Sequence, residues 1–292
     1  MRIRSAWGII QKTVGEFASG PILALSAATA YYAAFSIAPL LVLAVNLAGV
    51  AFGQDAVRSE IHRQLVGFLG QRSTKLVESM MNAQVRTGSP ISTMIVLVAL
   101  IFGATAVFSQ LQAGLNTIWG VTARPGNGIW LYIRDRLLSL AMLLGIGFLL
   151  LVSMALTTFV TAFMHYISAA IAVPAWTAPV SEGFVSFVVT SLLFGLIFKV
   201  LPDVKIRWRD VWIGAVATAL LFTTGKSLLG LYLAHEISAS AYGAGSAFVV
   251  ILLYVYYASL ILFFGAVFTK VYARWCGSSI QPSSYAVGSK KG

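Results

Sequence analysis

The charged residues of this chain are confined to short blocks, which leaves four long uncharged runs. Each run has 33 residues or more, and together they cover 17–54, 87–123, 137–181 and 237–269. About 20 apolar residues of helix cross the ~30 Å hydrocarbon core of a bilayer, and an unpaired charge buried there is costly. The composition agrees, because 59% of the residues are hydrophobic and only 10% are charged. The sequence therefore predicts a polytopic integral membrane protein of the all-α class.

The apolar segments divide into six predicted transmembrane helices. The run 137–181 is too long for one crossing, since a helix rises ~1.5 Å per residue. A turn is expected at residues 173–179, where Pro174 and Pro179 disfavour helix. The predicted spans are 22–51, 90–118, 137–165, 182–200, 210–234 and 243–272.

The distribution of Lys and Arg predicts the orientation of these spans. Fourteen of the 20 basic residues fall on the side that holds both termini, five fall on the opposite side, and Lys226 lies inside a span. Because basic residues are enriched in cytoplasmic loops, both termini are predicted to be cytoplasmic. The net charge of +11 is then mainly a topology signal with some attraction to anionic lipid, and it requires no nucleic acid partner.

Residues 53–89 form the one sizeable segment predicted outside the membrane, on the extracytoplasmic side. Apolar residues recur there at helical spacing in two sets, with Gly70 between them, which predicts two short amphipathic helices. The two sets are Val57, Ile61, Leu65 and Phe68, then Leu76, Val77, Met80 and Met81. One interpretation is a cap packed on the helix ends or lying on the outer lipid surface. The other is a substrate gate or a docking site for a partner.

Motifs for catalysis or metal binding are not found in the sequence. Gly225-Lys226-Ser227 has Leu220 where a phosphate-binding loop needs glycine. The three histidines are scattered, the nine carboxylates form no dense cluster, and Cys276 is the single cysteine. The sequence therefore predicts a protein that is not an enzyme, with no catalytic residue, metal site or cofactor.

Polar residues within the spans are the candidate functional residues. Lys226 lies in the fifth span, where it either snorkels toward the outer interface or lines a cavity that attracts an anionic group. Pro39 interrupts the first span and permits a kink, and Tyr31, Tyr32 and Tyr257 add hydroxyl groups to the first and sixth spans. These five residues are the predicted cavity or substrate set.

Two further patterns predict contacts between helices. Ser26, Ala30, Ala34 and Ala38 recur at every fourth residue of the first span, which makes a smooth stripe for close helix packing. Gln110, Gln112 and Asn116 share helical spacing at the inner end of the second span, and interhelical hydrogen bonding is their expected role.

Four motifs, in order along the chain, resemble the YihY/BrkB family. They are Ala27–Leu40 (AATAYYAAFSIAPL), Leu115–Gly120 (LNTIWG), the pair Leu201–Lys205 (LPDVK) and Trp208–Trp212 (WRDVW), and Tyr242–Ser246 (YGAGS). The resemblance covers about residues 15–275 and implies a six-span inner-membrane protein of bacteria. The family was once described as ribonuclease BN and is now regarded as lacking an established nuclease activity. The motif residues with an implied structural role are Asn116, Trp119, Asp203, Asp210, Tyr242, Gly243 and Gly245.

The last helix departs from the family pattern at two positions. The family often carries a glutamine and a glutamate where this chain has Leu260 and Val267. Asp203 and Asp210 are expected to pair with Lys205, Arg207 or Arg209 in a cytoplasmic connection. The whole chain, 1–292, is expected to form one membrane domain, with residues 276–292 as a flexible cytoplasmic tail.

Three functions are compatible with these features. The first is translocation or flipping of an anionic or amphipathic solute, or of a lipid, with membrane lipids as partners. The second is a noncatalytic scaffold for envelope assembly, which binds other envelope proteins or itself. The third, ranked last, is an RNA-cleaving enzyme, which only the old family description supports.

Overall fold

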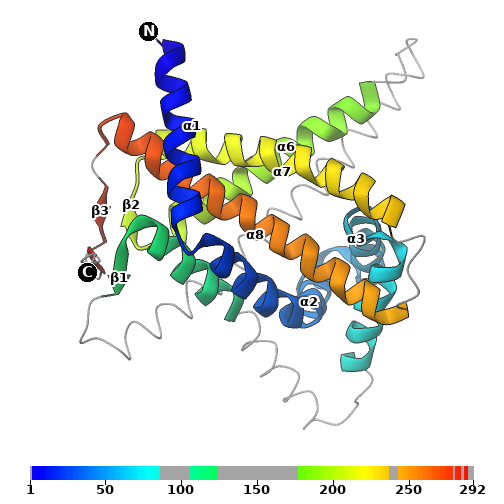
Figure 1. Ribbon diagram of the computed structural model, residues 1–292. Helices are drawn as coiled ribbons and strands as arrows, with labels where there is room; N and C mark the ends of the chain where they lie inside the picture. Colours follow the sequence, from blue (N-terminus) through cyan, green and yellow to red (C-terminus); the bar gives the residue numbers. More distant parts are fainter. Residues whose placement is uncertain are drawn as a thin grey trace.

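The computed structural model describes residues 2–85, 106–123, 177–236, 243–278, 280–283 and 286–288, and nearly all of them are helical. The helices are α1 (Arg2–Ser19), α2 (Ile22–Phe52), α3 (Gln54–Val85), α6 (Thr177–Val200), α7 (Trp208–Glu236) and α8 (Gly243–Trp275), with a further helix over 106–119. Helix α8 lies between α2 and α7 and also contacts α1 and α3, while α6 packs against α7 (Figure 1). The predicted third span, 137–165, lies outside the described residues, as does most of the second.

Three helices in the described part of the chain are long and apolar enough to cross a membrane. They are Gly183–Val200, Trp208–Leu229 and Phe248–Trp275, with mean hydropathies of 2.0, 1.3 and 2.3. A fourth candidate is a bent pair, Trp7–Ser19 followed by Ile22–Ile37, whose two parts meet at 67°. The three helices overlap the predicted fourth, fifth and sixth spans to within three residues at the ends that extend beyond them, and α2 covers the predicted first span.

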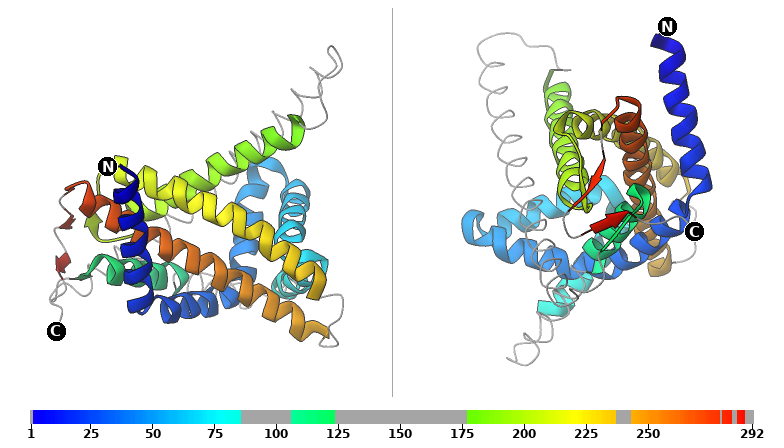
Figure 2. Two further views of the ribbon diagram at one scale, coloured as in Figure 1. Left: turned by 45° about the horizontal axis from the view of Figure 1, so that its top comes forward. Right: turned by 90° about the vertical axis from the view of Figure 1, so that its left-hand side faces the viewer.

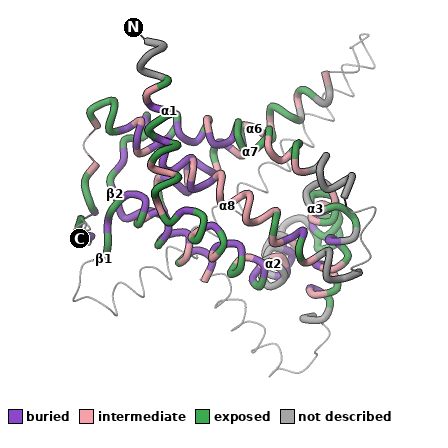
Figure 3. Tube along the Cα trace, in the orientation of Figure 1, coloured by how far each residue is buried: buried purple, intermediate pink, exposed green. Residues whose placement is uncertain are grey.

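Buried residues gather where the helices cross (Figure 3). The larger apolar cluster joins α6, α7, α8 and the helix over 106–119, and Leu115, Phe198, Val211 and Phe263 in it are completely buried. Large apolar side chains such as Phe184, 66% exposed, lie on the outer surface of the helices. In water such a surface would be a liability, whereas in a bilayer it faces hydrocarbon.

Helices α7 and α8 approach closely through a reciprocal pair of glycines and threonines. A Cβ added to Gly214 would lie 1.8 Å from Thr269 Oγ1, and one added to Gly265 would lie 1.9 Å from Thr218 Oγ1. The threonine hydroxyls donate within their own helices, Thr218 to Gly214 O at 2.6 Å and Thr269 to Gly265 O at 2.7 Å. Each helix thus has a glycine and, one turn away, a threonine whose hydroxyl donates to a carbonyl of its own helix. The two helices can therefore touch without leaving a polar group unpaired.

The stripe of small residues predicted in the first span is a packing surface. Ser26, Ala30 and Ala34 are at most 3% exposed on α2, which packs on α3 and α8. Pro39 lies within α2, which runs as one helix from Ile22 to Phe52.

Helix α3 is broken at Gly70, where the sequence predicts the boundary between two helices. Gly70 has φ 75° and ψ 167°, a conformation that L-residues with a side chain rarely adopt. The apolar face predicted on either side of it forms the second apolar cluster with α2 and α8. Its buried members are Val42, Val45, Val57, Leu65, Val77, Met81 and Ile251.

The described residues are mostly helical, as the predicted all-α class requires, and short strands at one end of the molecule add to the helices. Strand β1 (Val121–Ala123) pairs antiparallel with β4 (Ala286–Gly288), and β2 (Val204–Lys205) pairs antiparallel with β3 (Gln281–Pro282). Figure 2 shows these strands beside the ends of the helices. The tail pairs because β1 and β2 present main-chain donors and acceptors that helices cannot satisfy.

Candidate functional site

A buried polar cluster joins two of the family-type motifs. Asp203, 4% exposed, accepts hydrogen bonds from Gln112 Nε2 to Oδ1 at 3.2 Å and from Asn116 Nδ2 to Oδ2 at 2.8 Å. The Asp203 main-chain N–H donates to Asn116 Oδ1 at 2.8 Å, so the amide and the aspartate form a reciprocal pair. The contact spans 87 residues of sequence, and it ties the helix over 106–119 to the loop between α6 and α7.

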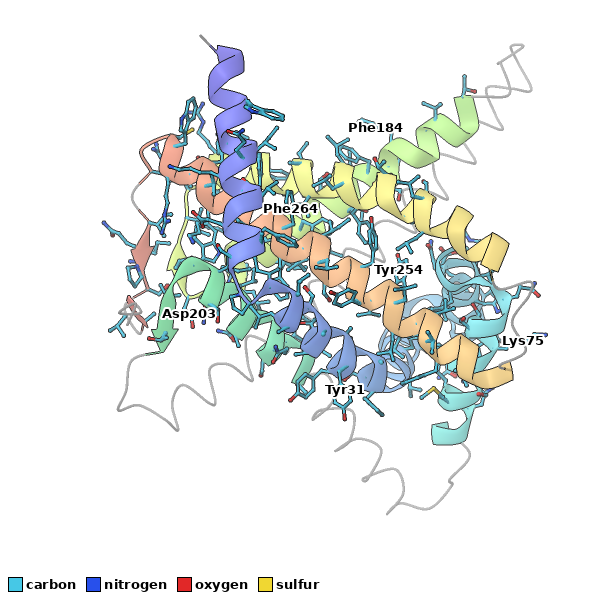
Figure 4. The ribbon with its side chains drawn as sticks, viewed as in Figure 1. Tyr31, Lys75, Phe184, Asp203, Tyr254 and Phe264 are labelled. Carbon is cyan, nitrogen blue, oxygen red and sulfur yellow. The ribbon has the colours of Figure 1, made fainter. Side chains whose placement is uncertain are left out.

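Local structure places both partners of this pair. The helix over 106–119 ends at Gly120, whose φ of 67° reverses the chain, and its N–H donates to Thr117 O at 3.2 Å. Asp203 follows Pro202 just beyond the end of α6, and its carbonyl accepts from the Ser283 N–H of the tail at 3.0 Å. The tail therefore closes over the cluster, at the end of the molecule where Figure 4 labels Asp203.

The pairing of Asp203 and Asp210 with Lys205, Arg207 or Arg209 stays a prediction. The described hydrogen bonds of the Asp203 carboxylate come from the amide side chains of Gln112 and Asn116. The sequence predicts hydrogen bonds between helices for Gln110, Gln112 and Asn116; Gln112 and Asn116 do bond to a distant segment, but their partner Asp203 lies in the loop between α6 and α7. Asp210 is also buried, and its Oδ2 has no hydrogen-bond partner among the described residues.

Lys226 lies on α7 beside the contact with α8. A Cβ at the preceding Gly225 would lie 1.5 Å from the Tyr257 hydroxyl, which donates to Leu221 O at 3.4 Å. The Tyr257 ring stacks near Phe222, with centroids 6.5 Å apart. Lys226 is half-buried, while the following Ser227 and Leu228 are exposed. The structure thus brings two of the predicted cavity residues, Lys226 and Tyr257, to one stretch of the α7–α8 contact.

The other predicted cavity tyrosines belong to a separate aromatic cluster. Tyr31 and Tyr32 are exposed on α2, with ring centroids 5.8 Å apart. Tyr31 packs at 5.0 Å on Phe35, which meets Phe248 of α8 at 6.2 Å. Figure 4 shows Tyr31 on an outward surface of α2.

Basic residues also mark the end of the molecule that carries the strands. Lys199, at the end of α6, donates to Ile206 O and lies 5.3 Å from the Trp208 ring centroid. Near the C-terminal end of α8, Lys270 forms an ion pair with Glu16 of α1 at 2.8 Å. Neither contact was foreseen, because no periodic pattern connects these distant positions.

The remaining motif residues have the following places. Trp119 is buried, with its indole N–H unpartnered among the described residues. Gly243 and Gly245 lie in the first turn of α8, and Tyr242 lies outside the described residues. Val267, where the family often has a polar residue, is 2% exposed in the large apolar cluster, so its surroundings suit an apolar side chain. The described residues contain no group of three His, Cys, Asp or Glu that could hold a metal ion.

Comparison with known proteins identifies the family. The profile described as virulence factor BrkB matches residues 13–284. The chain belongs to the virulence factor BrkB family. All four motifs lie within the match, so the Asn116–Asp203 pair joins two segments that belong to the BrkB region.

Relatives of this BrkB-family chain are UPF0761 membrane proteins of bacteria. One from Rhodospirillum centenum is 27% identical over 96% of this chain and 60% of its own length, and one from Idiomarina loihiensis is 27% identical over 79% of this chain and 78% of its own length. A third, from Tolumonas auensis, is 35% identical, but over only 27% of each chain. The chain therefore spans less than two thirds of some relatives. No solved structure matches it.

Proposed function

We propose that this membrane protein has six spans in the bacterial inner membrane, with both termini cytoplasmic, and translocates or flips an anionic or amphipathic solute or a lipid. The observation that carries the proposal is the half-buried position of Lys226 at the α7–α8 contact. It stands 18 residues after Trp208, which corresponds to ~27 Å of helix. Its charge is therefore near the opposite end of the span from Lys199 and Lys270.

Lys226 of α7 lies near one end of the α7–α8 pair and Lys270 of α8 near the other, and cations at both ends suit an anionic cargo. A positive charge half-buried in protein attracts an anion more strongly than one fully solvated, because screening by water is weaker. If Lys226 only snorkelled to the interface, its ammonium group would be exposed to water. Its position on α7 would then not matter for function.

The test is lipid transfer by the full-length protein in liposomes that contain a fluorescent anionic phospholipid. Lys226→Met should abolish transfer at unchanged thermal stability, and Lys226→Arg should retain part of it because the charge persists. Lys75→Met, an exposed lysine on α3, is the matched control and should transfer normally. Full transfer by Lys226→Met would remove this residue from the pathway.

The scaffold function is the second candidate, because the apolar face of α3 packs on α2 and α8 and holds its exposed polar face in a defined position. Envelope complementation separates the two functions. A scaffold would complement with Lys226→Met and show no lipid transfer. A scaffold would also lose complementation when exposed α3 residues are changed.

The proposal includes the absence of ribonuclease activity. Asp203 has its carboxylate oxygens occupied by amide donors, which suits a structural role. Purified protein freed of contaminating nucleases should cleave RNA no faster than the Asp203→Asn, Asp210→Asn double variant. Metal-dependent cleavage that disappears in the double variant would overturn this ranking.

A further inference from the structure

Helix α1 carries an exposed apolar stripe that no other helix covers in the part of the chain that the structure describes. Trp7, Ile10 and Val14 recur at spacings of three and four residues and are 61%, 48% and 50% exposed. Such spacing places them on one face of the helix. Gly15 and Ser19, which are also exposed, lie about 100° and 140° around the helix from Val14 and so on another face. Exposed tryptophan with aliphatic neighbours is typical of helices that lie in a membrane interface.

The rest of α1 is held firmly on α8, so the exposed stripe has a defined direction. Ile9 and Thr13 are buried, and Phe17 meets Phe264 edge-on with centroids 5.4 Å apart. Glu16 pairs with Lys270 at 2.8 Å and lies 3.8 Å from Arg274.

The direction of α1 differs from that of the helix that follows it. The segments Trp7–Ser19 and Ile22–Ile37 meet at 67°, with the break at Gly20 and Pro21. With Ile22–Ile37 crossing the bilayer near its normal, a helix at 67° to it lies closer to the bilayer plane than to the normal. Figure 2 shows α1 projecting across the direction of α8.

Basic groups border the opposite, polar edge of α1. A cavity of about 300 Å³ between α1 and the end of α8 is lined by Gly8, Ile9, Lys12, Glu16, Val271, Arg274 and Trp275. Its two cations and one carboxylate leave an excess of positive charge, and the carboxylate is already paired with Lys270. Trp275 is 58% exposed, and Trp208 at the same end of the molecule is 54% exposed. Exposed tryptophans beside cations mark the depth of lipid headgroups.

We propose that α1 lies in the headgroup layer at the C-terminal end of α8 and binds anionic phospholipids there. Trp7, Ile10 and Val14 enter the acyl boundary of the leaflet, while Lys12 and Arg274 contact the lipid phosphates. This leaflet is the cytoplasmic one in the proposed topology. The inference does not depend on translocation. It differs from the alternative in which α1 and α2 together form one bent span.

Site-directed spin labels on the full-length protein test the position of α1. In a Cys276→Ser background, single cysteines replace Trp7, Ile10 and Val14 on the apolar stripe and Gly15 and Ser19 on the other face. In liposomes of phosphatidylethanolamine and phosphatidylglycerol, the stripe should be accessible to oxygen, and the other face to a water-soluble nickel chelate. Depth that increases steadily along the chain from residue 7 to residue 15 would establish a bent span and overturn the proposal.

Quenching by brominated lipids tests the anionic preference. A bimane probe at Val14→Cys should be quenched more by brominated phosphatidylglycerol than by brominated phosphatidylcholine. Lys12→Gln should reduce this preference about fivefold, since one basic residue near an anionic surface is worth ~1 kcal/mol. The exposed Lys75→Gln on α3 makes the same charge change and should leave the preference unaltered. In the Val14→Cys protein with Lys12 and Lys75 unchanged, equal quenching by the two lipids would refute the preference for anionic lipid. Quenching by neither lipid would refute the interfacial position of α1.

Discussion

The α7–α8 crossing and the cluster around Asp203 are held together in opposite ways. At the crossing, Gly214 and Gly265 allow the helices to approach, and the threonine hydroxyls bond within their own helices. Around Asp203, side chains from distant segments exchange hydrogen bonds, and the tail adds a main-chain bond. The first region depends on shape and the second on polar complementarity.

This difference follows from the two environments. Within hydrocarbon, an interhelical hydrogen bond adds little, and close van der Waals contact is the main source of helix association. At the ends of the spans, loops expose main-chain groups that need partners, so polar side chains are useful there. Substitutions at the α7–α8 crossing and around Asp203 should therefore lower stability by different amounts and for different reasons.

The largest effect is expected when the crossing is filled. Gly265→Leu adds a side chain where even a Cβ would lie 1.9 Å from Thr218 Oγ1. Overpacking of this kind should lower the free energy of unfolding by about 3 kcal/mol or more. Thermal unfolding in detergent measures it. The control is Gly183→Leu on α6, where an added Cβ meets nothing within 4 Å, and equal destabilisation by both would argue against a close crossing.

Removal of the Asp203 carboxylate should lower the free energy of unfolding by less than filling the α7–α8 crossing does. Asp203→Ala leaves the amide donors of Gln112 and Asn116 without their acceptor, and a loss of about 2 kcal/mol is expected. A double-mutant cycle with Asn116→Ala should show coupling, because the pair is reciprocal. Additive effects of the two substitutions would show that the pair contributes no joint stability.

Deleting residues 280–292 should have a smaller effect, about 1 kcal/mol, because it removes short strand pairings and the Ser283 bond to Asp203 O. Hydrogen exchange by mass spectrometry should show faster exchange in β1 and β2 and unchanged exchange in α7. Unchanged exchange throughout β1 and β2 would contradict the docking of the tail.

The smallest effect is expected for Glu16→Gln, which removes the ion pair between α1 and Lys270. A partly exposed pair contributes at most about 1 kcal/mol. The loss of stability caused by Glu16→Gln should become smaller when salt is added, whereas the loss caused by Gly265→Leu should not depend on salt. Thermal unfolding of both variants in detergent, at low and at high salt, measures this difference. A loss for Glu16→Gln that does not depend on salt would indicate that Glu16 stabilises the protein by packing and not by its charge.

The sequence alone determined the properties that arise locally along the chain. Charge exclusion predicted membrane helices, and the bounds of α2, α6, α7 and α8 agree closely with the predicted spans. Helical spacing predicted the buried stripe of Ser26, Ala30 and Ala34, and Gly70 predicted the break in α3. Each of these follows from the hydrophobic effect or from backbone sterics over a few turns.

Only the tertiary structure decided which distant groups meet. Whether Asp203 binds a basic residue or Asn116, whether the tail pairs with β1 and β2, and whether Phe35 meets Phe248 depend on contacts between segments far apart in the chain. Glu16 meets Lys270 across 254 residues for the same reason. Hydrogen bonds and ion pairs act over a few ångströms, so their partners are set by how the helices pack and not by spacing along the sequence.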